Sequence, residues 1–171
     1  NRRMELYELY QLTRHAHGLK QPVLAQERMD QAMEIGHETG IHFHGPRLFG
    51  LQALIAPDTA ACRKALTEGE TLVRAGANAH NVLWFHRDAI DACLAIGDNE
   101  QARAHADALV AFTSEEPLPW AAFFAARGRV LADCAGGMGD AAALTRLHAQ
   151  GSQLGLAIAL PAIEASQAQF A

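Results

Sequence analysis

Three turns that each contain an aspartate recur at nearly constant spacing, and this periodicity constrains the fold more than any other feature of the chain. The dipeptides Pro57-Asp58, Gly97-Asp98 and Gly139-Asp140 each separate two segments of helical hydrophobic periodicity, and the aspartates lie 40 and 42 residues apart. Aspartate is a favoured N-cap because its carboxylate accepts hydrogen bonds from the unpaired backbone N–H groups of the first helical turn. Each turn therefore indicates the end of one helix and the start of the next.

A second marker keeps the same register as the aspartates. An arginine lies eleven residues before each of them, namely Arg47, Arg87 and Arg129. Helical hairpins repeated about every 40 residues are typical of an α-solenoid, in which stacked hairpins bury apolar faces that a single hairpin leaves exposed. We therefore predict an all-α fold over residues 1–171: one helical-repeat domain, an α-solenoid of about four antiparallel, tetratricopeptide-like helix pairs.

Hydrophobic periodicity and turn residues together predict nine helices. We expect them at about residues 2–17, 22–40, 47–56, 58–76, 80–96, 98–114, 119–136, 140–155 and from 161 onward, with a loop at 41–46. Alanine is abundant and aromatic residues make up only 6% of the chain, a composition that favours closely packed helices over a sheet.

Composition and charge also narrow the choice of partners and compartment. The net charge is −5 and basic residues do not cluster, so we expect no nucleic-acid partner. No run of 18 apolar residues occurs, so we expect no membrane-spanning helix. Cys62, Cys93 and Cys134 are far apart and form no CxxC pair, which predicts buried thiols in a cytoplasmic protein. Residue 1 is not methionine and the last helical stretch lacks a capping signal, so we expect a fragment of a longer multidomain protein.

The central and C-terminal parts of the chain resemble a known family. The resemblance rests on the runs Leu83-Trp84-Phe85-His86-Arg87-Asp88-Ala89-Ile90, Leu94-Ala95-Ile96-Gly97-Asp98, Pro117-Leu118-Pro119-Trp120 and Arg127-Gly128-Arg129, and it is clearest over residues 80–155. These runs resemble the C-terminal tetratricopeptide-like region of large bacterial proteins in which a class III adenylate/guanylate cyclase domain and an AAA-type ATPase domain precede the repeats. Similar repeats follow the ATPase module of large LuxR-type transcription regulators. The repeats here are longer than the 34 residues of a strict tetratricopeptide motif.

The resemblance implies a regulatory or partner-sensing role in signal transduction. The catalytic residues of the cyclase and ATPase domains would lie upstream, and none of them corresponds to a position in this chain. We therefore expect a segment that is not itself an enzyme, that needs no cofactor, and that acts as a scaffold for a protein or peptide partner, including other domains of the same chain. Self-association through the end helices is a further expectation, because a solenoid without its capping repeat exposes apolar surface.

The three arginines in register are the strongest candidates for a binding surface. If Arg47, Arg87 and Arg129 face a common concave groove, their planar guanidinium groups can bind an acidic peptide or a carboxylate. Trp84 and Trp120 are candidate aromatic anchors in the same groove. The competing interpretation is structural: Arg87 and Arg129 have an aspartate four residues further on, which predicts the intrahelical ion pairs Arg87–Asp91 and Arg129–Asp133, or pairs across repeats.

Two other functions stay open from the sequence. One is a ligand-sensing domain of an ATPase-type transcriptional regulator, with a small molecule or peptide bound in the groove. The other is a metal-dependent enzyme that uses His37, His42 and His44, because three histidines and a water can complete a zinc site. The segment His37-Glu38-Thr39-Gly40-Ile41-His42 does not have the spacing of a zinc-protease motif, since its histidines are five residues apart rather than four.

Overall fold

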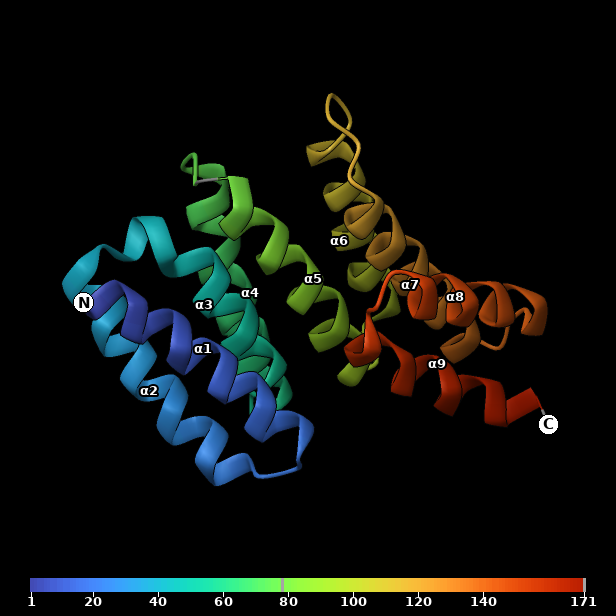
Figure 1. The fold of residues 1–171 in the computed structure, drawn as a ribbon, viewed down its shortest axis with the longest axis horizontal. Coiled ribbons are helices and arrows are strands. Elements are labelled where there is room, and N and C mark those ends of the chain that lie inside the picture. Colours follow the sequence, from blue (N-terminus) through green and yellow to red (C-terminus); the bar gives the residue numbers. More distant parts are fainter. Residues whose placement is uncertain (78, 171) are drawn as a thin grey trace. The chain divides into compact units, whose positions relative to one another are not determined.

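The computed structural model describes residues 1–77 and 79–170, and over these residues it is helical without a strand (Figure 1). This confirms the all-α prediction. The α-helices are α1 (Arg2–Gly18), α2 (Pro22–Thr39), α3 (Ile41–Leu54), α4 (Thr59–Arg74), α5 (Ala79–Ala95), α6 (Asn99–Phe112), α7 (Pro119–Ala135), α8 (Ala141–Gln153) and α9 (Leu160–Gln167). Short 3-10 helices, η1 (Ala157–Ala159) and η2 (Ala168–Phe170), flank α9. None of the described helices has both the length and the apolar character needed to cross a membrane.

The chain packs as two compact units, Asn1–Ala92 and Cys93–Ala171, and the boundary falls within α5. The sequence predicted one domain over residues 1–171. The two units are described separately below. The three cysteines are buried, as expected from their places on apolar helix faces.

In the first unit, α1 packs along α2 and α3 packs along α4, each pair running antiparallel (Figure 1). Its core joins apolar residues of the first three helices: Leu6, Leu9, Tyr10, Met29, Ala32, Ile35, Leu48 and Leu51. The α5 helix approaches α3 and α4 closely at two glycines. A Cβ atom on Gly69 would lie 2.3 Å from the ring of Phe85, and one on Gly50 would lie 3.1 Å from the Phe85 Cα.

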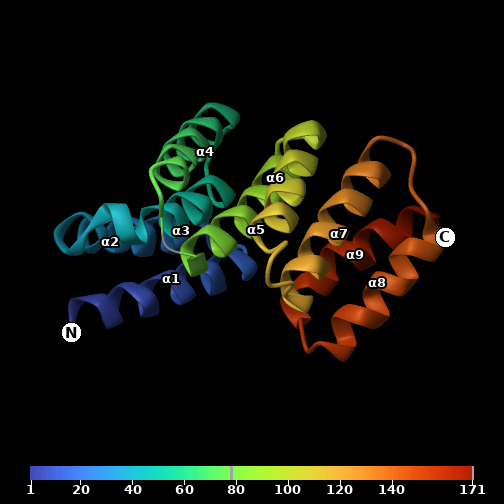
Figure 2. The same ribbon diagram turned by 90° about the horizontal axis from the view of Figure 1, so that it is seen from above.

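In the second unit, α6 packs on α7, and α8 and α9 complete a small bundle with α7 (Figure 2). Its core contains buried apolar side chains from all four helices, among them Leu109, Phe123, Leu131, Leu144 and Ile163. Arg127 is also buried there, and its Nε donates a hydrogen bond of 3.1 Å to the carbonyl oxygen of Ala159. This bond ties α7 to the segment that precedes α9.

The three aspartates that define the sequence period all cap helices. Asp58 precedes α4, Asp98 precedes α6 and Asp140 precedes α8, and each side chain accepts a hydrogen bond from a backbone N–H of the first turn. The three donors are the backbone N–H groups of Ala61 at 2.8 Å, Gln101 at 3.3 Å and Ala142 at 2.9 Å. The predicted role of these residues is confirmed.

One predicted boundary is wrong. The sequence predicted a loop at 41–46 followed by a helix from Arg47, whereas α3 begins at Ile41 and contains Pro46. A proline inside a helix removes a backbone hydrogen bond and clashes with the preceding turn, so the sequence alone favours a helix that begins after Pro46. In the structure, Gly40 at φ 121° ends α2, and its carbonyl oxygen accepts the backbone N–H groups of Phe43 and His44, so the first turn of α3 forms before the proline.

Candidate functional site

Three of the five residues predicted for a binding groove come together in the first unit. The guanidinium carbons of Arg47 on α3 and Arg87 on α5 lie 5.2 and 4.3 Å from the centroid of the Trp84 ring. The Arg47 guanidinium also lies over Tyr7 and Tyr10 of α1, at 4.8 and 4.2 Å. We call Tyr7, Tyr10, Arg47, Trp84 and Arg87 the arginine–aromatic cluster. It joins the odd-numbered helices α1, α3 and α5.

A buried carboxylate, Asp88, lies beside this cluster. Its Oδ2 accepts a hydrogen bond of 2.8 Å from the Tyr10 hydroxyl, and its Oδ1 accepts one of 2.9 Å from Nε of Arg87. Arg14 of α1 donates a further charged hydrogen bond to Oδ1. Arg87 also donates from Nη2 to the Tyr10 oxygen at 2.9 Å. Two guanidinium groups and a phenol therefore satisfy this carboxylate, which has no exposed surface.

The charges of this network shift the acidity of its members. Burial by itself raises the pKa of Asp88, but the charges of Arg14 and Arg87 and the Tyr10 hydrogen bond outweigh it, so the pKa of this carboxyl lies below its usual range. Burial and the Asp88 charge raise the pKa of Tyr10 to about 12. Burial lowers the pKa of Arg14, but its attraction to Asp88 and Tyr10 outweighs that effect and raises it overall. Asp88 is therefore ionised and Tyr10 is neutral at neutral pH.

Arg47 differs from Arg87 although the two occupy equivalent places in the sequence period. The side chain of Arg47 is only 6% exposed, and its Nε is buried without a hydrogen-bond acceptor among the described residues. Three residues earlier on α3, His44 is fully buried between the rings of Tyr7 and Phe43, and neither of its ring nitrogens has a partner among the described residues. Burial, together with the charges of Arg3, Arg47 and His80, lowers the pKa of His44. His44 is therefore neutral at neutral pH.

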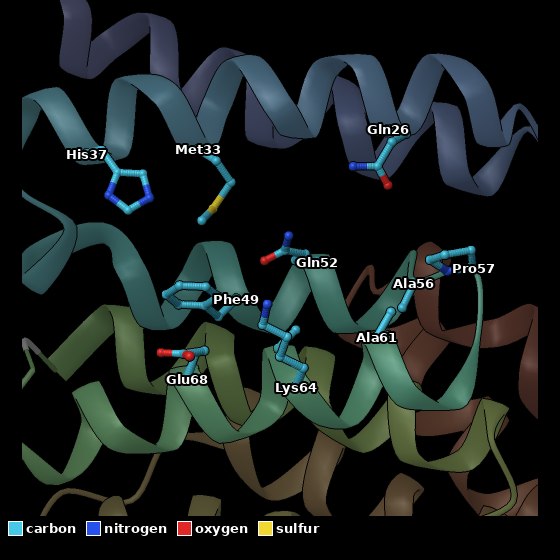
Figure 3. A pocket seen from close by; sticks show the side chains of 11 residues that line it. Gln26, Met33, His37, Phe49, Gln52, Ala56, Pro57, Ala61, Lys64 and Glu68 are labelled. Carbon is cyan, nitrogen blue, oxygen red and sulfur yellow. The ribbon is translucent and has the colours of Figure 1, made fainter.

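A pocket of about 510 Å³ opens between α2, α3 and α4, within the first unit (Figure 3). We call it the α2–α4 pocket. Its apolar lining consists of Met33, Phe49, Ala56, Pro57, Ala61 and Ala65, and its polar lining consists of Gln26, His37, Gln52, Lys64 and Glu68. Figure 3 shows Gln26 and Met33 extending from α2 toward α3, and Lys64 extending from α4 toward Gln52. Apolar and polar side chains of all three helices thus line the pocket together.

The two remaining groove candidates lie on α7, in the second unit. Arg129 donates from Nε and Nη2 to Oδ1 of Asp107 on α6, at 2.9 and 2.6 Å. Asp133 accepts from Arg103 of α6 at 2.6 Å. The predicted intrahelical pair Arg129–Asp133 is therefore wrong, because both residues pair across the α6–α7 interface. The Trp120 ring lies 4.7 Å from the ring of Phe124, one turn further along α7.

The three histidines proposed for a metal site do not converge. No group of three or more His, Cys, Asp or Glu side chains within residues 1–77 and 79–170 is arranged to hold a metal ion. His42 and His44 lie on the first turn of α3, where residues two apart point to different sides of the helix. As a result His42 is exposed whereas His44 is buried, and His37 is exposed on α2. The interpretation of His37, His42 and His44 as one zinc site was wrong because it assumed a loop.

Sequence reasoning missed Arg14 and Asp88, and it missed the α2–α4 pocket. One signal was available for the carboxylate: Asp88 lies in the predicted helix 80–96, next to the apolar Ala89 and Ile90, where an unpaired charge is costly. Comparison with protein-family models, with curated proteins and with solved structures finds no match to this chain.

Proposed function

We propose that this chain is a non-catalytic protein–protein interaction module and that a helical peptide segment of the partner binds in the α2–α4 pocket. The observation that carries the proposal is the pocket itself, in which apolar side chains of three helices lie beside polar ones. Amphipathic helices bind in grooves of this kind, because their apolar stripe is buried while their flanks keep polar contacts. The pocket lies on three packed helices, and such a site needs little reorganisation before it binds.

Charge complementarity defines the segment further. Lys64 and Glu68 are one turn apart on α4 and both line the pocket. A partner helix that carries an acidic residue opposite Lys64 and a basic residue one turn away, opposite Glu68, would satisfy both. Met33 and Phe49 would contact its apolar stripe. The volume also falls in the range of small-molecule pockets, roughly 300–1,000 Å³, but none of the charged groups in the lining is buried, and this favours a peptide over a small ligand.

We further propose that the chain is an α-solenoid of tetratricopeptide-like hairpins within a larger cytoplasmic bacterial signalling protein of the adenylate/guanylate cyclase type. Two observations support a repeat: the three capping aspartates, and the arginines that precede each of them by eleven residues on α3, α5 and α7. The cyclase context rests on the resemblance of residues 80–155 alone. A module of this kind would connect upstream catalytic domains to a regulatory partner.

Selection of peptides tests the proposed function. Random 12-residue peptides displayed on phage are selected against the wild-type chain and then measured against Ala61→Trp, which fills the pocket from the first turn of α4. The matched control is Ala60→Trp, because Ala60 is exposed on the same turn and does not line the pocket. We expect helical peptides with an acid–base pair one turn apart, bound equally by wild type and control and at least tenfold more weakly by Ala61→Trp.

Two results would overturn the proposal. Peptides that bind Ala61→Trp as tightly as wild type would place the interaction elsewhere on the chain. A failure to enrich any peptide, together with a thermal shift of the wild type but not of Ala61→Trp in a metabolite screen, would assign the pocket to a small-molecule sensor.

A further inference from the structure

We propose that Arg47 is an oxyanion-binding residue that accepts a carboxylate group of an acidic peptide segment on the α1–α3–α5 side of the first unit. This site is separate from the α2–α4 pocket: none of the five residues of the arginine–aromatic cluster lines that pocket. The inference does not depend on the proposed function, and either one can fail without the other.

Arg47 differs from the other buried arginines in its hydrogen bonding. Three arginines are buried in the described part of the chain: Arg47, Arg87 and Arg127. Arg87 donates to Asp88 and Tyr10, and Arg127 donates to the carbonyl oxygen of Ala159. Arg47 has a buried Nε without an acceptor, and no hydrogen bond or ion pair within residues 1–77 and 79–170 involves its guanidinium. Buried polar groups in folded proteins are nearly always hydrogen-bonded, so an exception of this kind needs a cause.

Arg47 lies in a region that contains further arginines. Arg14, Arg47 and Arg87 bring three positive charges to this region, and the buried carboxylate of Asp88 pairs with Arg14 and Arg87. Asp91 acts on Arg14 from further away, and Arg3 adds a positive charge near His44, over the ring of Phe43. Within residues 1–77 and 79–170, Asp88 accepts from Tyr10, Arg14 and Arg87, and no hydrogen bond or ion pair joins it to Arg47.

The shape of the Arg47 guanidinium favours a planar acceptor. Tyr7, Tyr10 and Trp84 meet the Arg47 guanidinium through their ring faces, which attract a cation but offer no acceptor that matches its N–H fork. A planar carboxylate does match this fork, because its two oxygens can accept two parallel N–H bonds. The rings also fix the orientation of the guanidinium, so that little side-chain entropy remains to be lost on binding. A single preoriented guanidinium suits a monoanionic planar group.

Trp84 provides a direct readout. It lies 5.2 Å from the Arg47 guanidinium, and the other tryptophan, Trp120, lies in the second unit. In a Trp120→Phe background, tryptophan fluorescence therefore reports on the cluster alone. The probes are an acetylated and amidated tetraglutamate peptide, its tetraglutamine counterpart and inorganic phosphate, each titrated at constant ionic strength. We expect saturable binding of tetraglutamate and none of tetraglutamine.

Variants separate a ligand role from a packing role. Arg47→Met keeps the volume and the apolar contacts, and Arg146→Met removes the same charge from an exposed side chain of the second unit. We expect Arg47→Met to weaken tetraglutamate binding at least tenfold without lowering Tm, whereas Arg146→Met leaves both unchanged. Arg47→Lys, which keeps the charge but loses the fork, should bind several-fold more weakly than wild type.

Four outcomes contradict the inference. They are a wild-type chain that shows no saturable response to tetraglutamate, equal binding by Arg47→Met, a lower Tm of Arg47→Met together with unchanged binding, and tighter binding of phosphate than of tetraglutamate. The last result would replace the carboxylate with a phosphate ligand. If Arg47→Met does not fold, the comparison of Arg47→Lys with wild type decides the same question.

Discussion

The hydroxyl of Tyr10 donates a 2.8 Å hydrogen bond to a carboxylate oxygen of Asp88, although 78 residues separate the two in the chain. This bond joins α1 to α5 across the core of the first unit, and the other oxygen of the same carboxylate accepts hydrogen bonds from two arginines. A buried ion pair is weak evidence of net stabilisation, because desolvation offsets much of the attraction. Replacing only one partner of a buried ion pair is strongly destabilising, because the remaining charges are then buried without a counter-ion.

Replacement of Asp88 by asparagine tests this asymmetry. Asp88→Asn removes the buried carboxylate that accepts from Arg14 and Arg87, so we expect it to lower the free energy of unfolding by about 3–5 kcal/mol. Tyr10→Phe removes one neutral donor and should cost about 1–3 kcal/mol. Urea denaturation followed by far-UV circular dichroism measures both. The control is Asp107→Asn, whose ion pair with Arg129 is exposed and should cost less than about 1 kcal/mol. Equal costs at Asp88 and Asp107 would contradict the importance of the network.

The buried His44 predicts a loss of stability in mild acid. Because the folded state lowers the pKa of His44, this residue stays neutral in the fold while the unfolded chain takes up its proton below about pH 6.5. The contribution of His44 is therefore fully present above pH 6.5 and is lost as the pH falls toward the folded pKa. The depressed pKa of Asp88 has the same sign but acts only at lower pH, below the ordinary pKa of an aspartate, about 3.9.

A His44→Phe variant isolates this effect. It keeps an aromatic ring between Tyr7 and Phe43 and removes the titrating nitrogens. We expect the free energy of unfolding to fall less steeply between pH 7 and pH 5 in His44→Phe than in wild type. The slope should not vanish, because burial also lowers the pKa of His17. His15→Gln, at an exposed position on α1, should keep the wild-type slope. Identical slopes in wild type and His44→Phe would show that His44 becomes protonated within the fold.

The sequence predicts the local structure of this chain well because the signals are local. Asp58, Asp98 and Asp140 cap helices within their own first turn, so no distant contact is needed to interpret them. The wrong prediction of a loop at residues 41–46 also comes from the use of local signals. Pro46 signals a helix start when only its neighbours are considered, but Gly40 starts the turn six residues earlier and α3 continues through the proline.

The candidate sites depend on contacts that the sequence does not specify. Arg47 and Arg87 occupy the same place in the period, yet Asp88 pairs with Arg87, whereas the Arg47 guanidinium lies over aromatic ring faces. That difference arises from Tyr10 and Arg14, which come from another helix hairpin. At the third place of the period, Arg129 is half-exposed, and the buried arginine of α7 is Arg127, two residues away. Periodicity predicted the helix for each arginine but did not predict its partner.

Close packing of α5 on α4 makes Gly69 sensitive to the smallest change. A Cβ atom there would lie 2.3 Å from the ring of Phe85, which is fully buried. We expect Gly69→Ala to destabilise the chain by about 1–3 kcal/mol through overpacking, partly offset by about 1 kcal/mol of helix propensity. Thermal denaturation of Gly69→Ala is compared with that of Gly18→Ala, a helical glycine with open space around it, which should be neutral or stabilising. The double variant Gly69→Ala/Phe85→Leu should lose less stability than the two single variants lose together. A loss equal to that sum would show that the Phe85 ring does not obstruct the added methyl group.

The pairing of α6 with α7 can be tested by double-mutant cycles, because the structure and the sequence period assign different partners to Asp133. In the structure, Arg103 donates to Asp133 and Arg129 donates to Asp107, both across the helix interface. We expect an Arg103→Ala/Asp133→Ala cycle to give a coupling energy of about 0.2–1 kcal/mol, the usual range for partly exposed pairs. An Arg129→Ala/Asp133→Ala cycle should give no coupling within error, although these residues are four apart on one helix. Coupling should decrease with added salt in the first cycle. A larger coupling for Arg129–Asp133 than for Arg103–Asp133 would show that the intrahelical pair, and not the pair across the interface, forms in solution.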